Sequence, residues 1–279
     1  MPGKAAGTVS ESHIERVCKP MSQMFDEKES RRIESVYLYA DVVAQRRRTL
    51  DVLALLPGER VADLGCGPGL LALDMARQVG PKGEVRCVDA SDSMVELAQR
   101  RLADLPQVQV QVGDVTSLPS ADESFDVVVS TQVYEFVAEV DRALAELRRV
   151  LKPSGRAVIV DTDWESCVWN SSDPERMRRV IEAWDLHCPH PHLPRTLARR
   201  LRDAGLGVER IEVFTLINDG YNANTYSHAM IPMIASWAKK QLSEDEVAGW
   251  SEDLRSLGGR GDYFFSLNRY LFVVRKMVS

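Results

Sequence analysis

The sequence lacks the features that mark nucleic-acid-binding and membrane proteins. Its 35 lysines and arginines are outnumbered by 41 acidic residues, giving a net charge of −6. That balance provides no basic field for nucleic acid or an anionic membrane surface. No apolar run approaches the roughly 20 residues that span a bilayer, and the N-terminus lacks the apolar core of a signal peptide. We therefore expect neither nucleic acid nor membrane as a partner.

Cysteines are few and show no paired spacing. Their odd number, five, argues against a disulfide framework and for reduced thiols in a cytoplasmic protein. Internal repeats and low-complexity tracts are also lacking. The 279 residues are 44% hydrophobic and 27% charged, which leaves room for one large α/β domain with additions.

The chain is organised around an apolar strand that runs into three glycines at alternate positions and then into a helix. The glycines are Gly65, Gly67 and Gly69, with Asp63 ahead of them. Glycine tolerates positive φ and lets a ligand lie against bare backbone, and the helix start presents free N–H groups. A dinucleotide site would need a further glycine where Leu70 stands, so the pattern disfavours a nicotinamide cofactor.

Three further strands end in polar residues. Residues 83–89 end in Asp89, about twenty residues beyond the turn, where a carboxylate can accept hydrogen bonds from ribose hydroxyls. Residues 108–112 lead into Gly113 and Asp114. The next strand, 125–130, leads into Thr131 and Gln132. Because ligands of open α/β sheets bind beyond the carboxyl ends of the strands, we expect these polar residues around one site.

These motifs together resemble a known family. Asp-Leu-Gly-Cys-Gly-Pro-Gly at 63–69, Asp89, Gly113-Asp114 and Arg-Val-Leu-Lys-Pro-Ser-Gly-Arg at 149–156 follow one another in order. In this they resemble the class I S-adenosylmethionine (SAM) methyltransferases, in the UbiE-like (methyltransferase type 11) small-molecule branch. The resemblance implies an α/β fold with a Rossmann-like, seven-stranded, mostly parallel sheet and an antiparallel last strand. It also implies an N-terminal helical cap and a helical insertion before the last strand.

The same resemblance, with the periodicity of apolar residues, divides the chain into segments. We expect a disordered N-terminus at 1–10, a helical cap at 11–56, the SAM-binding core at 57–216, a helical insertion serving as acceptor lid at 217–262, and the last strand at 263–279.

The resemblance implies S-adenosyl-L-methionine as cofactor and S-adenosyl-L-homocysteine as product. Residues of the helical cap would reach the methionine carboxylate. Asp89 and Asp114 would bind ribose and adenine, and the residues after the strand at 125–130 would face the sulfonium. The expected cofactor-binding residues are Tyr39, Gln45, Arg46, Asp63, Gly65, Gly67, Gly69, Asp89, Ala90, Met94, Gly113, Asp114, Val115, Thr131 and Gln132.

Aromatic residues in the second half predict the acceptor pocket. We expect it to be lined by Tyr134, Trp164, Trp169, Tyr221 and Tyr226. Methyl transfer from a sulfonium needs alignment in a dry cavity more than acid–base groups. A base is needed only where the acceptor loses a proton, and Tyr134, His187 and His192 are the candidates for that role or for orienting the acceptor. The spacing of the histidine-rich loop matches no common zinc pattern, so no metal is expected.

The function predicted is methylation of carbon, nitrogen or oxygen on a small acceptor. The acceptor would be largely apolar or aromatic, such as a quinone-like compound, an indole or another natural product of secondary metabolism. The alternative is a catalytically inactive SAM-binding regulatory or scaffold protein. The partner expected is the small-molecule acceptor, and the apolar N-terminal helices could pair two subunits as a homodimer.

Overall fold

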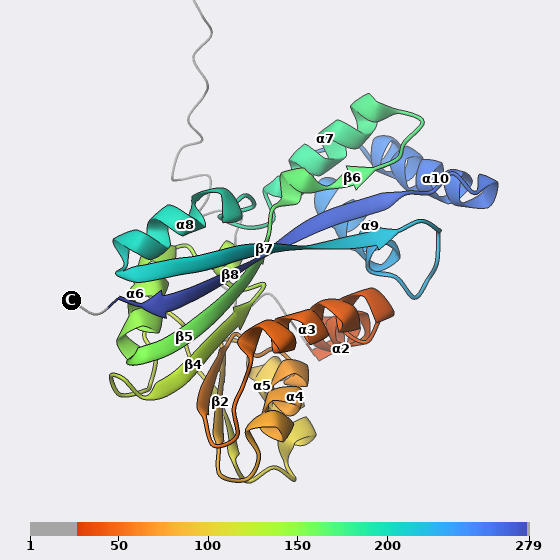
Figure 1. The fold of residues 1–279 in the computed structure, drawn as a ribbon. Coiled ribbons are helices and arrows are strands. Elements are labelled where there is room, and N and C mark those ends of the chain that lie inside the picture. Colours follow the sequence, from red (N-terminus) through yellow and green to blue (C-terminus); the bar gives the residue numbers. More distant parts are fainter. Residues whose placement is uncertain (1–26, 278–279) are drawn as a thin grey trace, which may run out of the picture.

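The computed structural model describes residues 27–277 and shows one twisted sheet with helices on both faces (Figure 1). The predictions for residues 1–10 and for the cap up to residue 26 lie outside the described residues. The strand order is β3-β2-β1-β4-β5-β8-β6, with β7 on the outer edge of β8. The strands are β1 (Arg60–Leu64), β2 (Glu84–Asp89), β3 (Val108–Val112), β4 (Phe125–Thr131), β5 (Leu151–Thr162), β6 (Val168–Trp169), β7 (Leu206–Asn218) and β8 (Phe265–Lys276).

The sheet is parallel from β3 to β5, and β8 runs antiparallel between β5 and β7. The mostly parallel α/β fold with an antiparallel last strand is therefore confirmed. One detail differs, because the sheet has eight strands where seven were expected. β5 pairs with β8 only over Arg269–Arg275, so β8 extends beyond it, and the two-residue β6 pairs with Phe265 and Ser266 there.

Helices cover both faces of the sheet because alternate strand residues are apolar on each side. Val158 and Val160 of β5 face the layer of α3, α4 and α5, whereas Ala157 and Ile159 face α6 and α8. The α-helices are α2 (Glu27–Val36), α3 (Ala40–Leu53), α4 (Leu70–Val79), α5 (Asp92–Leu102), α6 (Val140–Val150), α7 (Pro174–Asp185), α8 (Pro194–Asp203), α9 (Tyr226–Ala238) and α10 (Glu244–Arg260). Two 3-10 turns lie at Tyr134–Phe136 and Trp164–Ser166.

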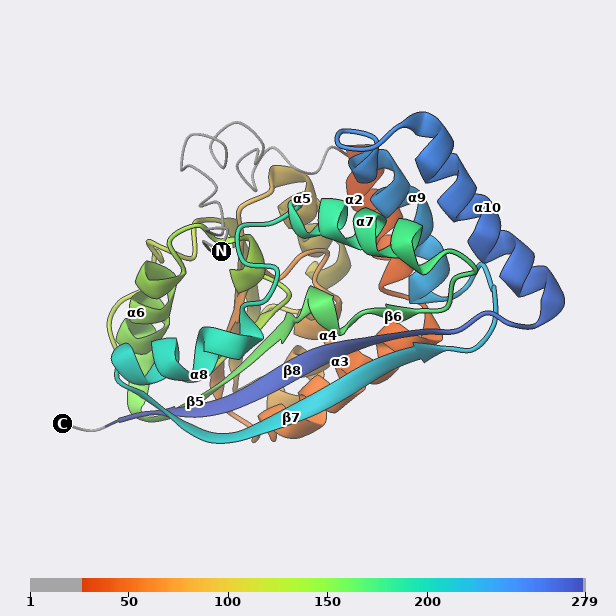
Figure 2. The ribbon, with the colours of Figure 1, turned by 90° about the horizontal axis from the view of Figure 1, so that it is seen from above.

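A second core lies where β7 and β8 project beyond the end of β5. The helices α7, α9 and α10 pack there, as Figure 2 shows. Its centre holds Trp250, which is fully buried, and the edge of Trp169 faces it with ring centroids 5.7 Å apart. This core thus brings aromatic side chains to the carboxyl end of β5.

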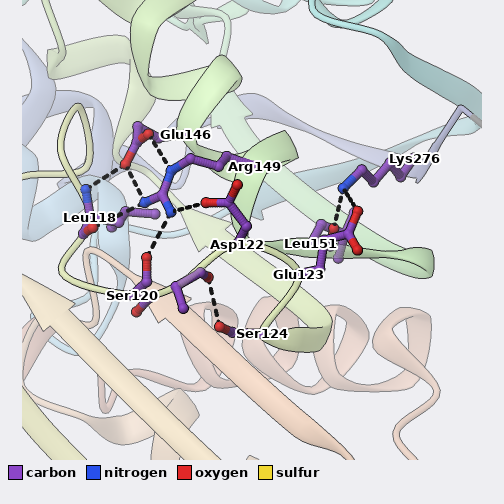
Figure 3. A network of polar contacts seen from close by, with 10 residues as sticks. Leu118, Ser120, Asp122, Glu123, Ser124, Glu146, Arg149, Leu151 and Lys276 are labelled. Carbon is purple, nitrogen blue, oxygen red and sulfur yellow. Dashed lines mark hydrogen bonds and ion pairs between the residues drawn. The ribbon is translucent and has the colours of Figure 1, made fainter.

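A polar network holds the loop that follows β3 (Figure 3). Arg149 of α6 donates to the carbonyl oxygens of Leu118 and Ser120 and pairs with Asp122, while Glu146 pairs with Arg149 and accepts from the Leu118 amide at 2.7 Å. The network explains the arginine that opens the 149–156 motif, because it anchors the segment after Gly113-Asp114.

No helix between residues 27 and 277 has both the length and the apolar composition needed to cross a membrane.

Candidate active site

The glycine turn between β1 and α4 has three left-handed residues, each needed for a different reason. Gly65, Gly67 and Gly69 have φ of +75°, +51° and +76°. A Cβ on Gly65 would lie 2.2 Å from Val133, and one on Gly69 would lie 3.1 Å from Ala98, so these two allow close packing. Among the described residues, a Cβ on Gly67 would have one contact within 4 Å, the Tyr37 ring at 3.8 Å. Gly67 therefore leaves room for a ligand against the backbone.

Two buried carboxyl groups flank this turn. Asp89 at the end of β2 accepts from the amides of Gly67 at 2.8 Å and Ser91 at 2.9 Å. Two hydrogen bonds leave part of its acceptor capacity free, since a carboxylate offers about four lone-pair sites. Asp63 in β1 is 2% exposed, and its Oδ2 has no partner. Burial, and secondarily the nearby Asp89, raises the pKa of Asp63 to about 7.

Two cavities adjoin at the carboxyl ends of β1 and β4. We name the first the cap cavity, because residues of α3 (Val42, Gln45, Arg46, Thr49) line it together with Asp63 and the glycine turn. The second, the aromatic cavity, has a volume of about 210 Å³ and extends from Asp89 and Met94 toward Trp164, Trp184, Trp237 and Tyr226. Six residues line both cavities: Tyr37, Gly65, Gly67, Thr131, Gln132 and Arg269.

Most of the predicted binding residues line these cavities. Gln132 has φ of +57°, an unusual conformation for a residue with a side chain. The predicted residues found in the linings are Gln45, Arg46, Asp63, Gly65, Gly67, Asp89, Met94, Thr131, Gln132, Trp164, His187 and Tyr226. Outside both linings lie Tyr39, Gly69, Ala90, Gly113, Asp114 and Val115, so for these a cofactor contact stays a prediction.

Tyr134 is a correction to the sequence-based expectation. The 3-10 turn rotates its ring into the core between the sheet and α6, where it is fully buried and its hydroxyl has no partner. Burial also raises the pKa of this hydroxyl far above its ordinary value. The next two residues of the turn, Glu135 and Phe136, line the aromatic cavity in its place.

Three other predicted acceptor-side residues also lie outside the cavities. Trp169 packs against Phe265 with ring centroids 4.8 Å apart, and Tyr221 packs against His228 at 4.8 Å. His192 lies 3.2 Å from Asp163 and 3.6 Å from Asp185. Aromatic packing of the second core accounts for the first two, and contact with these two carboxyl groups accounts for the position of His192.

His187 is the predicted base that does line the aromatic cavity. Its ring stacks on Trp184 at 3.9 Å, and Nδ1 lies 2.6 Å from the Trp184 carbonyl oxygen, which makes Nδ1 the protonated nitrogen. Nε2 is then an acceptor, and it has no partner. Burial lowers the pKa of His187 to about 4, so the ring is neutral at pH 7.

Several residues of the site were not predicted. Glu135 is buried, accepts from Trp164 Nε1 at 3.2 Å, and has its pKa raised by burial. Arg269 of β8 is 3% exposed and touches both cavities. A single arginine within the apolar strand Phe-Ser-Leu-Asn-Arg-Tyr-Leu-Phe was the available signal. The other unpredicted lining residues include Tyr37, Phe136, Trp184, Met230, Met233 and Trp237.

Among the described residues, six of the twelve buried polar side-chain atoms without a partner belong to residues that line the two cavities. A buried polar atom without a partner typically costs about 1–3 kcal/mol, so several in one place indicate groups reserved for a ligand. They are Asp63 Oδ2, Thr131 Oγ1, Trp184 Nε1, His187 Nε2, Trp237 Nε1 and Arg269 Nε.

Known proteins are similar in sequence to the part of this chain that forms the glycine turn and the parallel strands of the sheet. Residues 62–159 match the family described as a methyltransferase domain. An uncharacterized 37.1 kDa protein of transposon Tn4556 from Streptomyces fradiae is 40% identical over 169 residues, which are 60% of this chain and 49% of that protein. Demethylmenaquinone methyltransferase from Symbiobacterium thermophilum is 40% identical over 108 residues, 38% of this chain and 43% of the enzyme. The chain thus spans about half the length of these curated relatives.

Solved structures share the fold at lower identity. The [4+2]-cyclase SpnF matches with a TM-score of 0.55 and 22% identity over 85% of this chain and 82% of the cyclase. A phosphoethanolamine N-methyltransferase from Haemonchus contortus, in complex with S-adenosylhomocysteine, matches with a TM-score of 0.60 and 18% identity over 92% of this chain and 58% of that enzyme. With the sequence relatives and the glycine–acid arrangement, these findings show that residues 62–159 form a methyltransferase domain similar to that of the UbiE-like enzymes, on the fold that SAM-dependent methyltransferases share.

Proposed function

We propose that this protein transfers the methyl group of SAM to a small, largely apolar or aromatic acceptor, on carbon, nitrogen or oxygen. The observation that carries the proposal is the meeting of the two cavities at Thr131, Gln132 and Arg269. One side of that junction offers bare glycine backbone and carboxyl groups, and the other offers aromatic rings. A relative that is a demethylmenaquinone methyltransferase supports a quinone-like acceptor, although indoles and other aromatic natural products fit the same walls.

The residues present fit SAM. Asp89 has free lone pairs for the ribose hydroxyls, Met94 offers an apolar contact for adenine, and Gly67 leaves the backbone open. Thr131 and Gln132 would face the sulfonium, because they follow β4 at the junction. A buried negative charge at Asp89 also suits a cationic ligand.

SAM supplies a methyl group on a sulfonium, whose displacement in line requires no acid for the leaving group. The contribution of this chain is therefore to align the acceptor and to exclude water. Phe136, Trp164, Trp184 and Tyr226 form the apolar walls that do so. Neutral His187 would orient an acceptor O–H or N–H through Nε2, and it would take the proton where the acceptor loses one.

The experiment is turnover with SAM and a panel of acceptors: a hydroquinone, a phenol, an indole and an aryl amine. We expect S-adenosylhomocysteine to accumulate with at least one of them and the product to gain one methyl group, whose position identifies the atom attacked. Asp89→Ala is the matched control and should lose most of the turnover. Tight S-adenosylhomocysteine binding without methylation of any acceptor would instead favour the regulatory or scaffold alternative.

A further inference from the structure

Arg269 is a buried cation at a position that the fold reserves for apolar residues. Residues 265, 267, 271 and 273 of β8 share its face of the strand and are apolar and buried. Arg269 itself is 3% exposed and stands opposite Thr162 in the register with β5. Burying a guanidinium is costly unless it is paired, so its partners decide what it does.

The contacts of Arg269 leave its charge uncompensated. Nη1 donates to Gln45 Oε1 of α3 at 2.5 Å, the guanidinium lies 4.8 Å from the Tyr226 ring centroid, and Nε has no partner. Other partly buried arginines behave differently: Arg156 pairs with Glu59 at 2.7 Å, for example. Within residues 32–277, no carboxylate oxygen lies within the 4.0 Å ion-pair distance of Arg269.

Two other buried carboxyl groups, Glu135 and Asp161, lie near Arg269. Glu135 accepts from Trp164 Nε1. Asp161 Oδ1 accepts from the amide of Val133 at 3.2 Å, and its Oδ2 has no partner among the described residues. Burial raises the pKa of both carboxyl groups, and the charge of Arg269 only partly opposes this. They influence Arg269 through space without forming a pair with it.

The cap cavity carries a second unpaired group, a carboxyl group. Asp63 lines the same cavity as Arg269, is equally buried, and has an oxygen without a partner. No ion pair joins the two residues. One cavity thus presents an acceptor for a cation and a donor for an anion at separate points of its wall, which is the complement of an α-amino acid zwitterion.

We propose that Arg269 and Asp63 together recognise the amino-acid end of the cofactor, Arg269 binding its carboxylate and Asp63 its ammonium group. This rests on the proposed function. Gln45 then acts as a positioning residue, since its amide oxygen holds the guanidinium and its nitrogen donates to Thr49. Arg46, the residue expected in that role, has its Nε on Asp74 at 3.2 Å and its Nη1 on the Tyr37 carbonyl at 2.9 Å.

The test compares the affinities of three ligands by titration calorimetry on the full chain. SAM and decarboxylated SAM differ only in the carboxylate, and 5′-methylthioadenosine lacks the whole amino-acid group. We expect wild type to prefer SAM over decarboxylated SAM by roughly 10- to 100-fold. Arg269→Met should bring that ratio to within about 3-fold of one and leave methylthioadenosine binding unchanged, whereas Arg269→Lys should restore part of the ratio.

Two further variants complete the design. Arg275→Met changes an exposed arginine of the same strand, paired with Glu209, and should keep the wild-type ratio. Asp63→Asn should weaken SAM and decarboxylated SAM equally, because both carry the ammonium group. If Arg269→Met keeps the wild-type preference for SAM over decarboxylated SAM, Arg269 does not bind the carboxylate. The guanidinium would then be assigned to binding the methyl acceptor. If none of the three ligands binds wild type, the proposed function fails instead.

Discussion

The two sides of the site are built in different ways. The glycine–acid side consists of Asp63, Gly65, Gly67 and Asp89, which lie on the adjacent strands β1 and β2 and on the turn that follows β1. The aromatic side takes its walls from the turns after β4 and β5, from α7 and from α9. Those elements reach from residue 134 to residue 238. The first side therefore depends on local backbone geometry, and the second depends on how distant helices pack.

Because of this difference, a substitution on one side should have little effect on the ligand contacts of the other side. A substitution in the turn alters backbone conformation at the ligand. By contrast, one in an aromatic wall alters only the shape of the cavity beyond it. Where two substituted residues share no contact, their effects are usually additive to within a few tenths of a kcal/mol.

Gly67→Val should abolish binding of S-adenosylhomocysteine, with an affinity loss above roughly 1,000-fold, or about 4 kcal/mol. Its branched side chain would enter the space beside Tyr37, at φ of +51°. Gly80→Val is the control for backbone strain, because Gly80 also has positive φ, +68°, but nothing lies within 4 Å of its Cβ position. Equal affinity losses in the two variants would show that strain alone is responsible.

On the glycine–acid side, the free energy of unfolding should fall as pH rises. The pKa of Asp63 is about 7 in the folded chain, against an ordinary value of 3.8 for a solvated aspartate. The folded state therefore holds a proton that the unfolded state has released, and the stability this provides is lost between pH 4 and 7. Relative to Asp63→Asn, the ligand-free wild type should lose roughly 2–4 kcal/mol over that window. Urea unfolding at pH 5 and pH 8 measures the difference.

On the aromatic side, the sign is reversed. Burial lowers the pKa of His187 from 6.5 to about 4, so the unfolded chain gains a proton that the folded chain refuses. Stability present above pH 6.5 is lost as pH falls toward 4, by roughly 2–3 kcal/mol relative to His187→Phe. The same urea experiment at pH 7.5 and pH 5 tests it. A pH-independent difference between the two proteins would mean that the pKa of His187 is the same in the folded and unfolded states.

Trp237→Ala should have the smallest effect on the cofactor. Trp237 lines the aromatic cavity but not the cap cavity. We expect methyl transfer to fall by roughly 10-fold through lost acceptor contacts, with the S-adenosylhomocysteine affinity within about 2-fold of wild type. Calorimetry and turnover on one preparation measure both. An affinity loss as large as that of an Asp63 or Asp89 variant would break the separation of the two sides.

The sequence predicted the glycine–acid side well because its signals are local. The spacing of Gly65, Gly67 and Asp89 along two strands fixes their positions once the strands pair in parallel. The same reasoning was wrong for Tyr134. The alternation of side chains along β4 ends at Thr131. In the 3-10 turn that follows, Tyr134 faces the core, whereas Glu135 and Phe136 face the aromatic cavity.

The aromatic side was predictable only in part. Trp164 and Tyr226 lie close in sequence to strand ends, and both line the cavity. Trp184 and Trp237 come from α7 and α9, and no sequence pattern shows which face of a helix meets a cavity formed by other elements. Arg269 could have been predicted only from a charged residue at a core-facing position of a strand. Its contacts with Gln45 and Tyr226 explain how the structure accommodates it there.

The contact between Gln45 and Arg269 joins residues 224 positions apart in the chain. During synthesis on the ribosome, the central sheet up to β5 can form well before β8 emerges. Until then the wall of the cap cavity lacks the guanidinium of Arg269. On the role proposed for Arg269, a chain that has grown only as far as β5 would hold the glycine turn but would lack the group that distinguishes a cofactor with an amino acid from one without.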